Sequence, residues 1–509
     1  MFRIFNKILT QTQKIKDGKN IKNDGVLIKI DFKDDPDYIY GALESALKSA
    51  DFILIDGYFR SKRNMLASVF FLEKYKYFIE EWKMPSFADS GLVSLSGRLL
   101  IKTNGKAKKL KKNLSDYSYK EIESFYDKNY YLNDCGGYES FKINSTSLDV
   151  RLYVVQCLVD AGGGRFVREK ILDLGCGRGE LSYAMAKSGA DVLAIDYSAA
   201  SIAIAEKNYG SRLYNLNYKK VDFFELDPGL LFDKIVASDL VEHIDAALFE
   251  KFLGCIAAHL NKGGKFILHT APNKYVYSYK YKRDRLMAEE IGLFLPENPR
   301  SFYESLMHVN EQMPGSLKRA LKKYFKYVCV WTANTEEPAG DLQTKPSKSG
   351  LANHRSIFAI ASDDAGAISK EDIVNNLIQG KLNDISGVSL EFLPDFAYPK
   401  KIKKNTINIF RLKLINNGAI SLKSLGTNPV NLSYHIKDAS GNYIVHDGIR
   451  TGLPSIIYPN RAVEIDLYVC PPDGYTGTAY IEFTMVQEGI FWFENKKNEF
   501  ARTLKIKIV

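Results

Sequence analysis

The sequence predicts a multidomain protein: a doubly wound α/β domain with a seven-stranded sheet, a small N-terminal α/β domain and a C-terminal antiparallel β-sandwich. A chain of 509 residues with 45% hydrophobic and 26% charged residues is typical of folded domains, about three at this length. Strand-like and helix-like runs alternate from Lys170 to Asp364, which favours a mainly parallel sheet. From Asn405 to Val509, short β-rich runs alternate with turn residues, which favours a sandwich.

Charge and cysteine content limit the partners and the compartment. The formal net charge of +10 is spread over 70 basic and 60 acidic residues, so an anionic partner is permitted and nucleic acid is not expected. The six cysteines include no C-x-x-C pair, which argues against a zinc site or a disulfide framework. We therefore expect a cytoplasmic protein. Its basic opening segment is consistent with a frayed terminus or with peripheral association at the inner face of a membrane.

Residues 1–113 predict a small α/β domain of unknown role. A strand-like run begins at Gly25, a helix-like run follows near Asp35, and a second strand-like run covers Phe52 to Ile55. A further helix is expected over residues 66–82. The lysine-rich run of residues 103–113 is expected to be a solvated connector, with a phosphate-binding role as the alternative.

Residues 114–365 predict the central domain, in which ligands should bind at the carboxyl ends of the strands. The expected strands are KILDL (170–174), DVLAID (191–196), KKVDF (219–223), KIVASD (234–239), KFILHT (265–270), YVCVWT (327–332) and SIFAIAS (356–362). Residues 366–399 are expected to be a linker, and residues 400–509 the sandwich. Its expected strands are INIFRLKLI, VNLSYHIKD, AVEIDLYV, TAYIEFTMVQEG and TLKIKIV.

The stretch ILDLGCGRGE indicates a ligand site directly after the first strand of the central domain. Gly175, Gly177 and Gly179 allow a tight turn and a close approach of the backbone to a ligand. The spacing is G-x-G-x-G, which differs from the dinucleotide pattern G-x-G-x-x-G. Asp173 stands just before the loop, where it would repel a pyrophosphate. An adenosine ligand that carries a cation suits this pattern better.

Further polar residues follow the next strands. Asp196, with Tyr197 behind it, ends the second strand, where a carboxylate can accept hydrogen bonds from both hydroxyls of a ribose. Asp222 and Phe223 end the third strand and combine an acceptor with an aromatic face, which suits an adenine ring, although core packing is an ordinary role for such a phenylalanine. Ser238 ends the fourth strand.

These residues resemble the motifs of class I S-adenosylmethionine-dependent methyltransferases. LDLGCGRGE, AIDYS, VDFFE, ASDLVEHI and GGKFILHTAPN occur in that family's order. The resemblance implies a Rossmann-like seven-stranded domain with an antiparallel end and S-adenosylmethionine as the cofactor. It further implies that the glycine loop holds the amino-acid end, that Asp196 holds the ribose, and that Asp222 and Phe223 flank the adenine.

Two histidines are the candidates for a catalytic base, which a hydroxyl acceptor would need. His243, with Glu242, follows the fourth strand, although this pair could instead only order the loop. His308, beside Asn310, lies in an insertion that commonly shapes the acceptor pocket in the family that the chain resembles. His269 is better explained as a structural histidine near the sheet. No metal site is expected, because His and Glu ligands at a defined spacing are missing.

The aromatic segment FYDKNYYLNDCGGYESF, which precedes the first strand, is a candidate acceptor-binding segment. Methyltransferases of this type often use such a segment as a lid, which makes Tyr126, Tyr131, Gly137 and Tyr138 candidates. The alternative is an arm that packs across the sheet.

The C-terminal region resembles the glycan-binding β-sandwich attached to ABC transporters for O-antigen export. Its possible glycan contacts are Trp492, Tyr434, His446, Asp447 and Arg450, and core packing is the alternative for each. Together the two resemblances imply O-methylation of a sugar in a surface polysaccharide or its lipid-linked precursor. The alternatives are a small-molecule methyltransferase of the quinone-pathway type and a glycan-binding scaffold with a degenerate methyltransferase fold.

Overall fold

The computed structural model describes residues 119–133, 135–143, 148–160, 168–210, 212–290, 304, 307–335, 337–343 and 348–509, together with five short strands before them. The chain divides into two units. The first comprises Met1–Ile122 and Tyr275–Val309, and the second comprises Glu123–Lys274 and Asn310–Val509. The first boundary therefore lies after Ile122 and not after residue 113, and an insertion from the central region belongs to the first unit.

The first unit contains a five-stranded sheet in the order β1-β2-β3-β5-β4. Its elements are β1 (Gln13–Ile15), β2 (Gly25–Lys29), β3 (Phe52–Asp56), β4 (Ile79–Glu81), β5 (Leu99–Thr103), the π-helical turn η5 (Val276–Tyr281) and α11 (Lys282–Glu290). Strands β2 and β3 are parallel and correspond to the two predicted strands. The helix predicted for residues 66–82 is wrong at its end, because β4 pairs with β5 there. The helix predicted near Asp35 and the lysine-rich connector lie outside the described residues.

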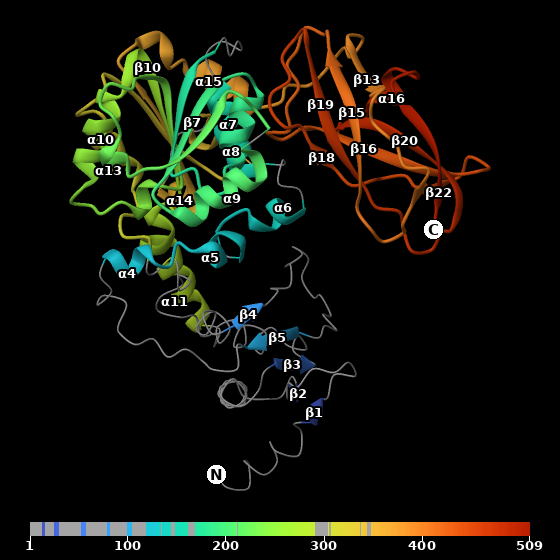
Figure 1. The fold of residues 1–509 in the computed structure, drawn as a ribbon, viewed down its shortest axis with the longest axis horizontal. Coiled ribbons are helices and arrows are strands. Elements are labelled where there is room, and N and C mark those ends of the chain that lie inside the picture. Colours follow the sequence, from blue (N-terminus) through green and yellow to red (C-terminus); the bar gives the residue numbers. More distant parts are fainter. Residues whose placement is uncertain are drawn as a thin grey trace. The chain divides into compact units, whose positions relative to one another are not determined.

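The central domain is built on a seven-stranded sheet in the order β11-β12-β10-β9-β6-β7-β8 (Figure 1). The strands are β6 (Lys170–Leu174), β7 (Asp191–Asp196), β8 (Leu216–Lys220), β9 (Phe232–Ser238), β10 (Leu260–Thr270), β11 (Tyr327–Ala333) and β12 (Ser356–Ser362). Neighbouring strands from β10 to β8 are parallel, and β12 is antiparallel to both β10 and β11. The expected seven-stranded sheet with an antiparallel end is thus present.

Helices cover both faces of this sheet, as its parallel strands require. The helices of this domain are α5 (Lys128–Asn133), α6 (Tyr138–Ile143), α7 (Val150–Asp160), α8 (Glu180–Lys187), α9 (Ala199–Tyr209), α10 (Phe249–Ala258), α13 (Pro314–Leu321), α14 (Lys348–Asn353) and α15 (Lys370–Leu377). A further helix, α4 (Tyr119–Glu123), spans the boundary between the two units. Short helical turns are η3 (Phe223–Glu225), η4 (Val241–His243), η6 (Gly340–Leu342) and η7 (Ala365–Ala367). One buried cluster joins the sheet to α7, α8, α9 and α15, and another joins it to α10 and α13.

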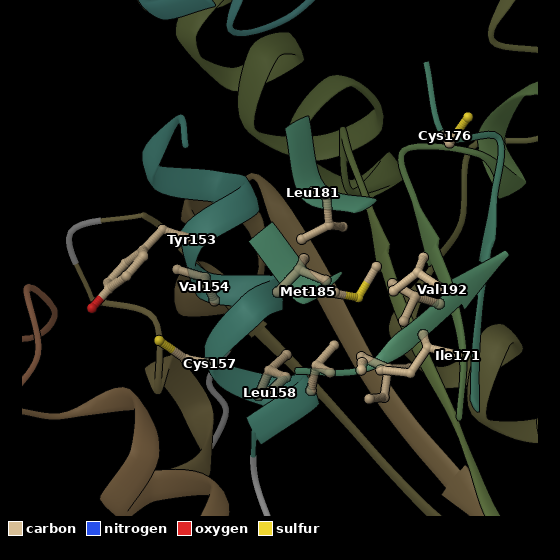
Figure 2. Close-up of a cluster of buried hydrophobic side chains, with 14 of the residues drawn as sticks. Tyr153, Val154, Cys157, Leu158, Ile171, Cys176, Leu181, Met185 and Val192 are labelled. Carbon is tan, nitrogen blue, oxygen red and sulfur yellow. The ribbon is translucent and has the colours of Figure 1, made fainter. Parts of the chain in front are cut away.

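Figure 2 shows how α7 and α8 close the first of these cores. Val154 and Leu158 of α7 and Met185 of α8 lie against Ile171 of β6 and Val192 of β7. All five side chains are buried, and four of them are 0% exposed. Burying such side chains supplies the main favourable free energy of folding. It holds the first two strands, and therefore the loops at their carboxyl ends, in a fixed place.

The sandwich consists of a three-stranded sheet, β13-β15-β19, and a second sheet with the path β14-β22-β20-β16-β17. Its elements are β13 (Val388–Phe392), β14 (Lys401–Ile402), β15 (Asn408–Asn416), β16 (Val430–Asp438), β17 (Tyr443–Val445), β18 (Thr451–Gly452), β19 (Arg461–Val469), β20 (Gly477–Gln487), β21 (Phe491–Trp492), α16 (Phe493–Lys496) and β22 (Arg502–Ile508). Its two sheets enclose a core of their own, and all five predicted runs are strands.

Residues 366–399 do not form the expected linker. Ile373 and Leu377 of α15 are buried in the core of the central domain, and β13 pairs with β15 as a strand of the sandwich. Their apolar residues are buried by neighbours distant in sequence, which the local sequence does not reveal. Within the described residues, no helix is long and apolar enough to cross a membrane.

Candidate active site at the carboxyl edge of the sheet

The glycine loop lies between β6 and α8 and needs its glycines. Gly175, Gly177 and Gly179 have φ angles of 66°, 53° and 86°, in the left-handed region that favours glycine. A Cβ atom added at Gly175 would lie 2.9 Å from Leu240 Cδ1, and one at Gly179 would lie 2.7 Å from the Tyr218 hydroxyl. A Cβ atom on Gly177 would meet nothing closer than Tyr131 Cε1 at 3.9 Å. The outer glycines thus serve the fold, while a Cβ atom at Gly177 would make only an ordinary van der Waals contact with Tyr131.

Asp196 joins the glycine loop to the end of β7. Its carboxylate accepts hydrogen bonds from the backbone N–H of Gly177 (3.0 Å) and of Ser198 (2.8 Å). The Ser201 side chain also hydrogen-bonds this carboxylate. A carboxylate offers about four acceptor positions, so acceptor capacity remains for a ribose hydroxyl. Burial raises the pKa of Asp196, against the lowering effect of these two backbone hydrogen bonds. At the expected ribose-binding position, the Asp196 carboxylate therefore keeps acceptor capacity for a ligand and is held in place by two backbone hydrogen bonds.

Asp173 lies beneath the loop and is only 2% exposed. It accepts a hydrogen bond of 2.5 Å from the Ser182 hydroxyl in the first turns of α8. Burial raises its pKa to about 7, and the hydrogen bond from Ser182 opposes that shift. Asp173 thus ties α8 to β6, and its second task, attraction of a bound cation, stays a prediction.

Arg178, which the sequence analysis did not single out, connects the glycine loop to the aromatic segment. Its guanidinium donates hydrogen bonds to the carbonyl oxygens of Tyr131 (2.9 Å), Cys135 (3.1 Å) and Gly136 (2.7 Å). Its Nε donates to Glu180 (2.8 Å), and its side chain is 3% exposed. The sequence did contain one indication of this role, because Arg178 is a cationic residue between Gly177 and Gly179 of the loop.

The aromatic segment places two predicted tyrosines at the site. Tyr131, which is 4% exposed, lies over Gly177, and burial raises its pKa. The Tyr126 hydroxyl lies 2.9 Å from His243 Nδ1, and its ring contacts Tyr197 edge to face. Residues from three separate parts of the chain thus meet here. Tyr138 begins α6, where Lys142 Nζ lies 5.0 Å from its ring centroid.

His243 and Glu242 lie on η4, after β9. The Glu242 carboxylate is buried and accepts a hydrogen bond from the Thr270 hydroxyl (2.7 Å) at the end of β10. Its backbone carbonyl accepts one from the N–H of Asn310 (2.9 Å). Glu242 therefore orders this loop, while His243 faces Tyr126. The catalytic roles of both stay predictions.

Asp239, a second residue that the sequence analysis missed, occupies the turn after β9 with a φ of 51°. It forms ion pairs with Arg151 (3.1 Å) and His269 (2.9 Å). Burial raises the pKa of Asp239, but Arg151 and His269 outweigh that effect and hold it well below its usual range. His269 is fully buried and also lies 3.0 Å from the Ser356 hydroxyl, so its structural role is confirmed.

Two buried polar atoms at this edge have no hydrogen-bond partner within the described part of the chain. They are Ser238 Oγ, at the end of β9, and Asn310 Nδ2. A buried polar group without a partner is costly, so such atoms point to a ligand. The residues therefore fit S-adenosylmethionine: a glycine backbone at Gly177 that no neighbour crowds, acceptor capacity on Asp196 and an unused hydroxyl on Ser238.

Asp222 and Phe223 lie just beyond β8, which ends at Lys220 and so ends earlier than expected. The reason is local: Asp222 leaves the strand and caps η3 by accepting a hydrogen bond from the N–H of Phe224 (3.0 Å). Phe223 is half-buried and packs edge to face on Phe252 of α10. Their contact with an adenine stays a prediction.

Two further candidates are His308 and Trp492. His308 belongs to the first unit, where its backbone N–H donates to the Glu304 carbonyl, so its role as a base stays a prediction. Trp492 lies in the sandwich, with the Arg450 guanidinium 4.9 Å from its ring centroid and the His435 ring 4.5 Å away. Tyr434 is 1% exposed, so its prediction as a glycan contact is wrong: alternation along β16 turns it into the core.

Comparison with known proteins agrees with this geometry. Residues 152–326 match the family model described as "Methyltransferase domain". The chain is 35% identical over 101 residues to a ubiquinone biosynthesis O-methyltransferase of Bradyrhizobium sp. (strain ORS 278), which is 20% of this chain and 39% of that protein. It is 32% identical over 142 residues to the Coxiella burnetii (strain Dugway 5J108-111) protein of the same name, which is 28% of this chain and 58% of that protein.

A solved structure is also similar, at 15% identity and a TM-score of 0.31: magnesium protoporphyrin IX methyltransferase (ChlM) from Synechocystis PCC 6803 with bound SAH. The match covers 46% of this chain and 96% of that one. These two curated relatives match this chain over 39% and 58% of their own length. The central part of the chain, residues 152–326, is therefore similar to a methyltransferase domain.

Proposed function

We propose that the chain transfers a methyl group from S-adenosylmethionine to an oxygen acceptor, a sugar hydroxyl of a surface polysaccharide or of its lipid-linked precursor. The observation that carries the transfer to oxygen is the pair formed by His243 and Tyr126, 2.9 Å apart, on segments that adjoin the glycine loop. A hydroxyl acceptor needs a base, and histidine is suited to that role near neutral pH.

The chain's own residues divide the work. When bound, S-adenosylmethionine supplies an electrophilic methyl group on a sulfonium. The backbone at Gly177 and the spare acceptors of Asp196 bind and orient the cofactor. In the tautomer that donates Nδ1–H to the Tyr126 hydroxyl, His243 presents Nε2 as the proton acceptor for the sugar hydroxyl. Holding the two partners in line supplies much of the rate enhancement.

The glycan acceptor is supported by the C-terminal sandwich. Trp492 is half-buried there and lies beside His446 and Arg450, a combination of an aromatic ring and polar groups that suits sugars. The second candidate is a small-molecule acceptor of the ubiquinone-pathway type. It is favoured by the similarity to ubiquinone biosynthesis O-methyltransferases.

The first experiment is calorimetric titration with S-adenosylmethionine and S-adenosylhomocysteine. We expect micromolar binding in the wild type and affinity at least about 100-fold lower in Asp196→Ala. The variant removes the carboxylate that accepts the hydrogen bonds of Gly177 and Ser198 and that would accept those of the ribose. Asp466→Ala, which removes a sandwich carboxylate paired with Arg411, is the matched control and should bind normally. An absence of binding in the wild type would overturn the enzyme proposal in favour of a glycan-binding scaffold.

The acceptor is then tested with S-adenosylmethionine labelled in the methyl group. Lipid-linked and free polysaccharide fragments are compared with a prenylated catechol. Label in the glycan fraction supports the proposed acceptor. Label in the catechol alone would transfer the proposal to the small-molecule candidate.

A further inference from the structure

The glycine loop holds the aromatic segment through one buried cation. The three carbonyl groups that accept from Arg178 span Tyr131 to Gly136, at the end of α5 and in the turn after it. Hydrogen bonds from a charged donor are about twice as strong as neutral ones, and the planar guanidinium orients its partners. The Phe141 ring, 5.2 Å from the guanidinium carbon, adds a further contact from α6. Any movement of the loop at Arg178 is therefore transmitted to this segment.

A second arginine, Arg151 of α7, lies against the same turn. A Cβ atom added at Gly136 would lie 2.6 Å from Arg151 Nη1, so the guanidinium of Arg151 lies directly against this glycine. Arg151 Nε pairs with Asp239 at the end of β9, and Asp239 pairs with His269 of β10. The turn at Gly136 is thus fixed between the glycine loop and the ends of the two central strands.

The segment that these arginines hold carries both sides of the candidate site. Tyr131 covers Gly177, where the cofactor is expected, and Tyr126 contacts His243, the proposed base. The Tyr126 carbonyl also accepts a hydrogen bond from the Ser198 hydroxyl (2.8 Å), next to Asp196. A displacement of the segment would therefore alter the cofactor pocket and the base together.

We propose that Arg178 and Arg151 are positioning residues that couple occupancy of the cofactor site to the placement of Tyr126 and Tyr131. The proposal rests on the proposed function, because it assumes that an adenosyl cofactor binds at the glycine loop. A bound cofactor stiffens the loop, and Arg178 passes that stiffening to the segment. The acceptor side is then completed only after the cofactor has bound, which disfavours binding of an acceptor without a methyl donor.

Hydrogen–deuterium exchange of the full chain with and without S-adenosylhomocysteine tests the coupling. In the wild type, we expect the ligand to slow exchange in residues 126–143 by about tenfold, since ligand binding suppresses local opening. In Arg178→Ala the slowing should fall below about twofold, although calorimetry still detects ligand binding. Arg212→Ala, which removes an exposed arginine of the same domain, should behave like the wild type.

Two milder variants keep the test decisive if Arg178→Ala fails to fold. Arg178→Lys keeps the charge without the planar fork, so intermediate protection is expected. Gly136→Ala displaces Arg151 without altering the glycine loop, and it too should reduce the ligand-dependent protection. Unchanged protection in variants that bind the ligand would overturn the coupling. A wild type that binds no S-adenosylhomocysteine would overturn the proposed function, whereas binding without any protection would overturn the coupling alone.

Discussion

The carboxyl edge of the central sheet and the contact between α7 and the sandwich use buried polar groups in opposite ways. At the sheet edge, Ser238 Oγ is buried without a partner in the part of the chain that the structure describes, and Asp196 has acceptor capacity to spare. At the α7 contact, the Tyr153 hydroxyl accepts from the N–H of Ser424 (3.1 Å), and the Tyr458 hydroxyl donates to the Asp160 carbonyl (3.3 Å).

This difference separates a surface that binds a ligand from one that joins two domains. A docking contact gains from pairing every polar group that it buries, since each unpaired one costs about 1–3 kcal/mol. A binding site leaves some buried polar groups unpaired, and the ligand forms the missing hydrogen bonds when it binds. Changes at the sheet edge should therefore act mainly on binding and turnover, and changes at the α7 contact mainly on stability.

The largest effect is expected at His243. We expect His243→Ala to lower turnover by about 10²–10⁴-fold, the usual contribution of a positioned base, while S-adenosylhomocysteine affinity changes little. Tyr126→Phe, which removes the partner of Nδ1, should cost less because the imidazole remains. Initial rates with labelled cofactor and calorimetry separate the two quantities. Equal loss of affinity and turnover would show that His243 only orders the loop.

The next effect compares two glycines with nearly equal backbone angles. Gly179 in the loop has a φ of 86°, and Gly441 in the hairpin between β16 and β17 has a φ of 87°. An added Cβ atom meets the Tyr218 hydroxyl at 2.7 Å in the first case and nothing within 4 Å in the second. We expect Gly179→Ala to destabilise by about 3 kcal/mol and Gly441→Ala by about 1 kcal/mol, as measured by urea denaturation. A similar loss of unfolding free energy in the two variants would mean that backbone strain alone, and not the contact with Tyr218, causes the destabilisation.

Asp160, at the α7 contact, predicts a pH dependence. Burial raises its pKa to about 8, with an opposing effect from Lys234, whereas an aspartate in an unfolded chain titrates near 4. The folded state therefore keeps a proton that the unfolded state has lost, so this contribution to stability is full below about pH 4 and is lost as the pH rises to about 8.

Asp160→Asn, which cannot titrate, should lack that part of the pH dependence. Between pH 5 and 8, the unfolding free energy of the wild type relative to the variant should fall by about 1 kcal/mol per pH unit. Urea denaturation across this range measures the difference, in which groups common to both proteins cancel. Parallel curves for the two proteins would contradict the raised pKa.

The smallest effect is expected at Tyr153. Tyr153→Phe leaves the half-buried N–H of Ser424 without its acceptor, which should cost about 1 kcal/mol and leave cofactor affinity unchanged. Tyr475→Phe is the matched control, because its hydroxyl bonds an exposed carbonyl, that of Thr478. Reduced S-adenosylhomocysteine affinity in Tyr153→Phe would remove the distinction between the two regions.

The sequence by itself determined the strands, the glycine turn and the order of the acids along the sheet. These features are local: apolar periodicity defines KILDL and DVLAID as strands, and three alternate glycines after a strand define a turn that side chains would obstruct. Parallel strands bring their carboxyl ends to one edge, so the meeting of Gly177 with Asp196 could also be predicted.

Only the tertiary structure decided which residues from distant segments meet. Arg178 was unremarkable in the sequence, because its partners lie more than 40 positions earlier and are backbone carbonyls, which any residue supplies. The same holds for α15 and β13, which a composition shift had suggested as linker, and for Tyr434, which its strand turns inward. Long-range contacts depend on the path of the whole chain, whereas turns and strands depend on neighbouring residues.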